Sequence, residues 1–266
     1  MEPPSRRRRA RPIGITDRDR ELLAFAAEHR FVTAGQVAAL LHVSQSTAEW
    51  RLRRLDARQL VNRSNLRLSG EPACHQITRD GLRAVGSDLP VPRSVDLAAL
   101  RHDRGLAWLT LAALDGCFGR ALRVVGERRM RSEDGRRPDG GARHGVRRGD
   151  TGAAGLESLH YPDLVLETPA GGRVAFELEL TTKERDRRER ILAAYGADRT
   201  IDAVVYLVET AAAGRAVQRS AERLGIGSLV HIRRVSLEGV PRGAAQGRAA
   251  QLRHGRDSRG KAVRSL

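Results

Sequence analysis

Apolar residues recur at helical spacing in three short segments near the start of the chain. Thr16, Thr33 and Ser44 precede these segments, and side chains of this type accept hydrogen bonds from the first turn of a helix. Two short apolar runs, 60–61 and 73–78, follow with a polar loop between them and predict a hairpin. Three short helices and a hairpin are the pattern of a winged helix-turn-helix.

Beyond residue 95 the pattern changes to strands that alternate with longer helices. The expected elements are helix 97–114, strand 122–125, the paired strands 161–167 and 174–181, helix 182–195, strand 203–208, helix 211–224 and strand 228–232. These elements predict an α+β protein whose second domain has a mixed central sheet. The expected organisation is a disordered basic arm at 1–14, a winged helix-turn-helix domain at 15–90, a second domain at 96–235 with a flexible insertion at 131–156, and a disordered basic tail at 241–266.

The chain is strongly basic, with 48 Lys and Arg residues against 32 Asp and Glu residues and a formal net charge of +16. Such a charge favours a polyanionic partner, either nucleic acid or an anionic lipid surface. Nearly all basic residues are arginine, which suits phosphate and guanine contacts, although a GC-rich genome would also raise the ratio of arginine to lysine. Aromatic residues make up only 3% of the chain, which leaves few rings for stacking on unpaired bases. Double-stranded DNA is therefore the expected partner.

Other features of the sequence argue against several classes of protein. Two cysteines, Cys74 and Cys117, are too few for a disulfide framework or a metal cluster. The first residues lack the apolar stretch of a signal peptide, and the longest apolar run, 106–114, is too short to span a membrane. No amphipathic, aromatic-bearing helix flanks the basic segments, which argues against a membrane-surface protein. We therefore expect a cytoplasmic protein without a membrane partner.

The third predicted helix carries the residues expected to contact DNA. In a winged helix it lies in the major groove, while the hairpin contacts the flanking backbone. Its amino end presents Gln45, Ser46 and Thr47 to base edges and phosphates. The segment 41–70 holds six arginines against two acidic residues, which favours DNA over the protein contacts that some winged helices make. The expected phosphate contacts are Arg51, Arg54, Arg58, Arg63 and Arg67.

Three acidic residues are expected to gather in the second half of the chain. At strand spacing Glu177 and Glu179 share one face of their strand, and a hairpin brings Asp163 of the preceding strand close to them. Carboxylates so close repel one another unless they are protonated or bridged by a cation. Carboxylate oxygens suit Mg²⁺ or Mn²⁺, so either ion is the expected cofactor if a cation is bound.

The segments Tyr161-Pro162-Asp163 and Phe176-Glu177-Leu178-Glu179 resemble the motif of the PD-(D/E)xK nucleases. The resemblance implies a restriction-endonuclease-like fold for the second domain. It also implies that Asp163 and Glu177 hold a metal ion that activates water, with Glu127 as an additional upstream acid. On this resemblance the enzyme would be a Mg²⁺-dependent DNA endonuclease.

The sequence departs from this motif at its third position, where Glu179 stands in place of lysine. The lysine of the family helps to position water and to offset developing charge, and its absence puts catalysis in doubt. Lys183 and Arg190 are the basic residues that would have to replace it. The candidate catalytic residues are Asp163, Glu177, Glu179 and Lys183, and the candidate metal ligands are Asp163, Glu177 and Glu127.

A longer series of short motifs runs through residues 15–208. They are Thr16-Asp-Arg-Asp, Phe31-Val-Thr, Leu52-Arg-Arg-Leu55, Leu60-Val61, His102, Glu127-Arg-Arg, Pro162-Asp163, Glu177-x-Glu179 and Arg190-Ile-Leu-Ala-Ala-Tyr195. In this order they resemble the replication-relaxation family of actinobacterial plasmids and integrative elements. The resemblance implies DNA binding in replication, mobilisation or maintenance of such an element, and it leaves a relaxase, a replication protein and a homodimer open as further partners.

Two functions stay open at this point. The first is a DNA-processing protein that nicks near its binding site, which Asp163 and Glu177 favour. The second is a non-catalytic transcriptional regulator or relaxosome accessory with an inactive nuclease-like domain, which Glu179 favours. His102 and Tyr195 are more simply interpreted as core residues than as a catalytic base and a nucleophile.

Overall fold

The computed structural model describes residues 14–64, 72–138, 141–151, 157–181 and 183–236. The predicted basic tail at 241–266 and nearly all of the predicted arm at 1–14 lie outside these residues, as does the tip of the hairpin with Arg67. Within the described part of the chain, no helix is long and apolar enough to cross a membrane.

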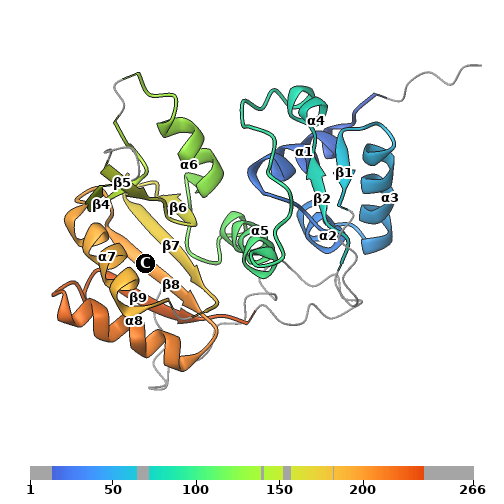
Figure 1. The fold of residues 1–266 in the computed structure, drawn as a ribbon. Coiled ribbons are helices and arrows are strands. Elements are labelled where there is room, and N and C mark those ends of the chain that lie inside the picture. The colour runs from blue at the N-terminus through green and yellow to red at the C-terminus, as the bar shows by residue number, and fades with distance from the viewer. Residues whose placement is uncertain (1–13, 65–71, 139–140, 152–156, 182, 237–266) are drawn as a thin grey trace, which may run out of the picture.

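The first unit of the fold contains three short helices, a hairpin and a fourth short helix after it (Figure 1). Its elements are α1 (Asp17–Glu28), α2 (Ala34–Leu41), α3 (Gln45–Asp56), β1 (Val61–Arg63), β2 (His75–Ile77) and α4 (Arg79–Ala84). The helices begin where the sequence predicts, because the side chains of Thr16, Thr33 and Ser44 each accept a backbone N–H of the first turn. The strands β1 and β2 pair antiparallel. This is the arrangement of a winged helix, and that prediction is confirmed.

The second unit is built on a five-stranded mixed sheet of order β3-β6-β7-β8-β9. Its strands are β3 (Arg123–Gly126), β6 (Leu164–Glu167), β7 (Arg173–Glu179), β8 (Ala203–Val208) and β9 (Val230–Arg234). The first three are antiparallel, and β8 and β9 continue parallel to β7. The parallel crossovers run through α7 (Arg185–Ala197) and α8 (Ala211–Arg223). The α+β class with a mixed sheet is therefore confirmed.

The two faces of β7 pack against different helices, as its alternating sequence predicts. Phe176 and Leu178 point into the core that includes residues of α5 (Leu100–Leu114). Ala175 points the other way, into the core formed with α7 and α8. Figure 1 shows these two helices on the side of the sheet away from α5. Glu177 and Glu179 are consequently on the α7 side, and both are buried.

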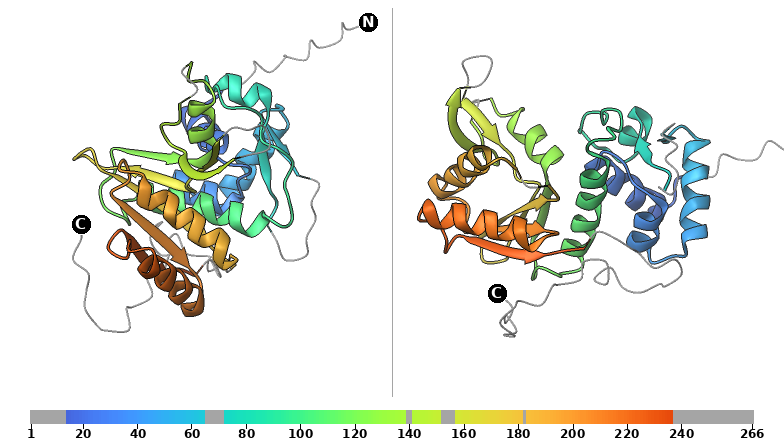
Figure 2. Two further views of the ribbon diagram at one scale, coloured as in Figure 1. Left: turned by 60° about the vertical axis from the view of Figure 1, so that its left-hand side comes forward. Right: turned by 60° about the horizontal axis from the view of Figure 1, so that its bottom comes forward.

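Helix α5 packs against both units. It follows the expected domain boundary near residue 96, yet part of it belongs to the core of the winged helix. Ala107 and Leu111 belong to the core of the winged helix, while Leu109 and Ala112 belong to the core over the sheet. The right-hand view in Figure 2 shows α5 between the two units. A hydrogen bond from Gln36 Nε2 of α2 to the carbonyl of Arg104, at 2.9 Å, fixes the same junction.

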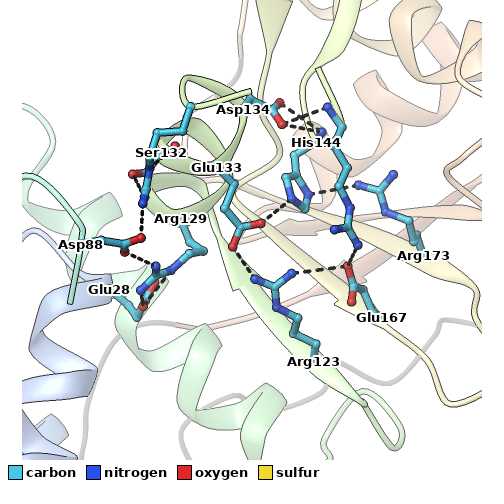
Figure 3. Close-up of polar contacts among 12 residues, drawn as sticks. Glu28, Asp88, Arg123, Arg129, Ser132, Glu133, Asp134, His144, Glu167 and Arg173 are labelled. Atoms are coloured by element: carbon cyan, nitrogen blue, oxygen red, sulfur yellow. Dashed lines mark hydrogen bonds and ion pairs between the residues drawn. The ribbon is translucent and has the colours of Figure 1, made fainter. Parts of the chain in front are cut away.

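The predicted flexible insertion at 131–156 is wrong for the residues that the structure describes. Helix α6 (Glu127–Asp134) enters this segment, and β4 (Val146–Thr151) pairs antiparallel with β5 (Glu157–His160). The Asp134 carboxylate accepts the backbone N–H groups of Arg143, His144 and Gly145. Figure 3 shows these contacts and the neighbouring Glu133. The contacts of Asp134 in the described part of this segment are polar, and a search for apolar periodicity does not detect them.

Candidate functional site

Helix α3 presents a polar face to solvent from the surface of the winged helix. Ala48, Leu52 and Leu55 point into the core and are fully buried. The side chains exposed on the opposite side are Gln45, Ser46, Glu49, Trp50 and Arg53. Ser44 caps the helix by accepting the N–H of Thr47 at 3.2 Å, and its hydroxyl also contacts the hydroxyls of Ser46 and Thr47. The predicted base-contacting residues therefore lie at the accessible amino end of α3.

Arg51 and Arg54, both predicted to contact phosphates, are held by a buried carboxylate of α1. Arg51 Nη1 is 2.9 Å from Asp19 Oδ1, and Arg54 forms an ion pair with the other oxygen of Asp19. Asp19 is fully buried. Burial acts to raise the pKa of Asp19, but the hydrogen bonds from Thr16, the charge of Arg54 and the hydrogen bond from Arg51 outweigh it and lower that pKa. These arginines fix α3 on α1, so their predicted contact with DNA stays a prediction.

The other predicted phosphate contacts lie along the edge of the same unit. Arg58, just after α3, and Arg63 on β1 are exposed. The backbone N–H of Arg63 donates to Asp56 Oδ1 at 3.2 Å, which connects β1 to the end of α3. Arg67 lies outside the described residues.

Sequence reasoning missed Trp50, although its position could have been deduced. Trp50 lies one turn after Ser46 and one turn before Arg53 and Arg54, on the same outward stripe. Half of its surface is exposed, and the guanidinium of Arg54 lies 5.0 Å from the centre of its ring. The signal was a bulky aromatic residue on the polar side of a helix whose apolar stripe was already complete.

Glu177, a predicted catalytic residue and metal ligand, is surrounded by hydrogen-bond donors. Its Oε1 accepts the Tyr195 hydroxyl at 2.5 Å and lies 2.6 Å from His160 Nε2. Its Oε2 is 3.5 Å from Lys183 Nζ. Burial acts to raise the pKa of Glu177, but the charges of His160 and Lys183 and the hydrogen bonds outweigh it and lower the pKa to about 2. Glu177 is therefore a buried, ionised carboxylate.

Lys183 lies two residues before the start of α7 and contacts the second acid of the strand as well. Its Nζ is 3.8 Å from Glu179 Oε2, and its backbone N–H donates to Glu179 Oε1 at 3.2 Å. Burial acts to lower the pKa of Lys183, whereas Glu177, Glu179 and Asp163 outweigh it and raise that pKa. The ammonium group of Lys183 thus lies close to two buried carboxylates and offsets their charge.

Asp163 and Glu127 have partners of their own. Asp163 Oδ2 accepts the backbone N–H of Leu178 at 2.7 Å and lies 3.3 Å from Nε2 of His102 on α5. The backbone N–H of Glu127 donates to the carbonyl of Asp163 at 3.3 Å, but the Glu127 side chain pairs with Arg131 at 2.7 Å. The structure brings Asp163 near His102 and Lys183. The Glu127 carboxylate instead forms an ion pair with Arg131 of the same helix, α6.

A divalent cation does not fit the acids as they are arranged. In the described part of the chain, no three His, Cys, Asp or Glu side chains form a group that could hold a metal ion. The ammonium of Lys183 already lies beside Glu177 Oε2 and Glu179, and Glu177 Oε1 is engaged by Tyr195 and His160. A positive charge on the protein itself thus offsets the repulsion that suggested a metal.

Ion pairs fix the winged helix relative to the sheet. Arg129 of α6 bonds Glu28 at the end of α1 and Asp88 of the linker, as Figure 3 shows. Arg30 lies 3.7 Å from Asp103 of α5, close to His102 and Asp163. The acidic site is therefore adjacent to the junction between the two units.

Comparisons with known proteins add little beyond the fold. No family model matches the chain, and no curated protein matches it. The crystal structure of transcriptional regulator Tm0710 from Thermotoga maritima matches 27% of this chain and 50% of its own at 24% identity, with a TM-score of 0.24. The crystal structure of RV1404 from Mycobacterium tuberculosis matches the same shares at 23% identity, with a TM-score of 0.26. The match spans about half the length of each structure, and the scores are too low to support an argument about function.

Proposed function

We propose that this protein binds double-stranded DNA by placing α3 in the major groove. The observation that carries the proposal is the exposed face of α3, with Gln45, Ser46 and Arg53 on a helix whose opposite side is fixed in the core of a winged helix. Small polar side chains at the amino end of such a helix suit base edges, and a following hairpin suits the flanking backbone. The net charge of +16 supports a polyanionic partner.

The proposal assigns the phosphate contacts to exposed arginines. Arg53, Arg58 and Arg63 are exposed around the end of α3 and on β1. Arg51 and Arg54 are partly covered and paired with Asp19, so their part is to hold α3 in place. Exposed guanidinium groups make forked contacts with phosphate, and each such contact releases counterions.

For the second unit we propose a non-catalytic role, as a nuclease-like domain that no longer cleaves DNA. Glu179 in the position of the motif lysine supports this, as does the carboxylate of Glu127, a predicted metal ligand, which pairs with Arg131. A regulator or an accessory of a replication or mobilisation complex is the corresponding function. The link to plasmids or integrative elements, like a relaxase or homodimeric partner, rests on the sequence resemblance alone and stays a prediction.

Removal of the exposed arginines is expected to weaken DNA binding and its dependence on salt. In a variant with Arg53→Ala, Arg58→Ala and Arg63→Ala, the slope of log Kd against log salt should fall by about three, since each phosphate contact contributes about one. The measurement is fluorescence anisotropy with labelled duplex DNA over a range of salt concentrations. The matched control removes three exposed arginines of the second unit, Arg187, Arg215 and Arg219.

The control variant has the same net charge as the test variant, so it separates a local contact from a general charge effect. It should keep a slope close to that of the wild type. An unchanged slope in the test variant, or an equal loss in both variants, would contradict the assignment to α3 and β1.

Plasmid nicking is expected to be absent with Mg²⁺ or Mn²⁺. Supercoiled plasmid should stay intact with the wild-type protein, because Glu179 stands where the motif has lysine and the Glu127 carboxylate pairs with Arg131. The measurement is the conversion of supercoiled to open circular DNA on an agarose gel, compared with Asp163→Ala and Glu177→Gln. Metal-dependent nicking that disappears in both variants would overturn the non-catalytic role but leave DNA binding by α3 intact.

A further inference from the structure

Trp50 is the large apolar side chain on the exposed face of α3. The other large apolar residues with exposed side chains among those the structure describes, Val91, Leu97, Leu114, Leu122 and Leu224, lie outside the winged helix. The neighbours of Trp50 along the exposed stripe are polar, with Ser46 one turn before it and Arg53 one turn after it. A single ring surrounded by polar groups is smaller than the apolar patch that a protein interface requires. It fits a partner that offers one small apolar group within a polar surface.

The ring of Trp50 is also held in position before any partner binds. Arg54 lies 5.0 Å from the centre of the ring, in the range of a cation–π contact. Arg54 is itself paired with the fully buried Asp19 on α1. The contact thus connects an exposed ring to the core through two charged residues. A side chain ordered in advance loses less conformational freedom when it binds.

We infer that Trp50 contacts the methyl group of a thymine in the bound DNA. This inference rests on the proposed position of α3 in the major groove. The C5-methyl of thymine is the apolar group that base pairs present there, among hydrogen-bond donors and acceptors that suit Gln45 and Ser46. The backbone of DNA supplies the negative charge that Arg53, Arg58 and Arg63 complement.

The experiment compares thymine with uracil, which differs only by this methyl group. Preferred sites are first selected from a random duplex library with the wild-type protein. Each thymine of the selected site is then replaced by uracil in turn, and Kd is measured for the wild type and for Trp50→Ala. At one position the wild type should lose roughly fourfold in affinity, the contribution of one buried methyl group. Trp50→Ala should bind the two duplexes equally.

The intrinsic fluorescence of Trp50 supplies a second measurement. The chain has two tryptophans, and Trp108 packs partly buried against the core of the winged helix. In the variant Trp108→Phe, the remaining emission comes from Trp50 and should change when the selected duplex is added. The same duplex with uracil at the identified position should give a smaller change at equal saturation.

The outcomes separate this inference from the proposed function. If the wild type does not bind duplex DNA, the proposed function fails. If the wild type binds but no thymine position is sensitive to uracil, the inference fails while the proposed function stands. Equal sensitivity in the wild type and in Trp50→Ala would also overturn it. A change of oligomeric state in Trp50→Ala with thymine discrimination intact, measured by sedimentation velocity, would assign the ring to a second copy of the chain instead.

Discussion

Replacement of Lys183 by methionine is expected to lower the free energy of unfolding by about 3 kcal/mol. Methionine keeps much of the length of the side chain but removes the ammonium group that lies 3.5 Å from Glu177 and 3.8 Å from Glu179. Both carboxylates are buried, and Glu179 Oε2 lacks a hydrogen-bond partner apart from this charge. Loss of one partner leaves buried charges uncompensated, which costs more than the pair contributes. The melting temperature should fall by about 6 to 12 °C for a protein of this size.

Two control variants separate charge from packing at this position. Lys183→Arg keeps a positive charge and should lose much less stability than Lys183→Met. The double variant with Lys183→Met and Glu179→Gln should recover part of the loss, because Glu177 keeps its contacts with His160 and Tyr195. A melting temperature for Lys183→Met within about 1 °C of the wild type, in the range expected of a neutral surface substitution, would contradict the compensating role of Lys183.

The same variants test whether the acids of β7 can bind the metal ion that the sequence suggested. Once Lys183 is replaced, the acids of β7 lack their internal cation, and a divalent ion added to the solution can take over that charge. Millimolar Mn²⁺ should therefore raise the melting temperature of Lys183→Met more than that of the wild type. Stabilisation of the wild type by Mn²⁺ that is lost in Glu177→Gln would show that the native site binds a metal.

The helices of the winged helix and the strands of the sheet could be predicted from the sequence because their signals are local. Thr16 and Thr33 each form a capping box within four residues, and Phe176 and Leu178 alternate with acids along one strand. The pairing of β4 with β5 could not be predicted in this way. The residues just before β4 are held by Asp134, which accepts N–H groups from residues nine to eleven positions away.

The contacts made by the candidate site residues could not be predicted from the sequence. Arg51 and Arg54 fit the charge pattern of a DNA-binding helix, yet both face Asp19, more than thirty residues earlier in the chain. Only the packing of α3 on α1 shows this. Lys183 and Arg190 were both candidates to replace the motif lysine, and the contact of Lys183 with Glu177 and Glu179 depends on how the chain turns into α7. Pairs of distant residues are set by tertiary packing, which a single sequence does not report.

Replacement of Asp19 by alanine is expected to lower the free energy of unfolding by about 3 kcal/mol and to weaken DNA binding as well. The change leaves Arg51 and Arg54 without their buried partner and removes the side chain that bonds Thr16 at the start of α1. With its two arginines released, α3 loses its fixed angle on α1, and Arg54 no longer holds the ring of Trp50. Chemical denaturation and anisotropy with duplex DNA measure the two effects.

The destabilisation caused by Asp19→Ala should depend on pH in one direction. The pKa of Asp19 is lowered in the folded protein, so the unfolded chain takes up a proton first as the solution is acidified. The contribution of Asp19 is therefore complete above about pH 5, since the unfolded pKa is about 4, and it decreases as the pH falls towards the folded pKa. The difference in stability between the wild type and Asp19→Ala should shrink over that range.

Asp17 provides a matched control for Asp19, in the same first turn of α1. Its carboxylate is exposed and lies 3.9 Å from Arg20, a surface pair of the kind that contributes little to stability. Asp17→Ala should therefore leave DNA affinity close to that of the wild type and change stability by less than about 1 kcal/mol. If Asp19→Ala and Asp17→Ala behave alike in both measurements, Asp19 does not orient α3. Arg51 and Arg54 would then be free to contact phosphates, as the sequence first suggested.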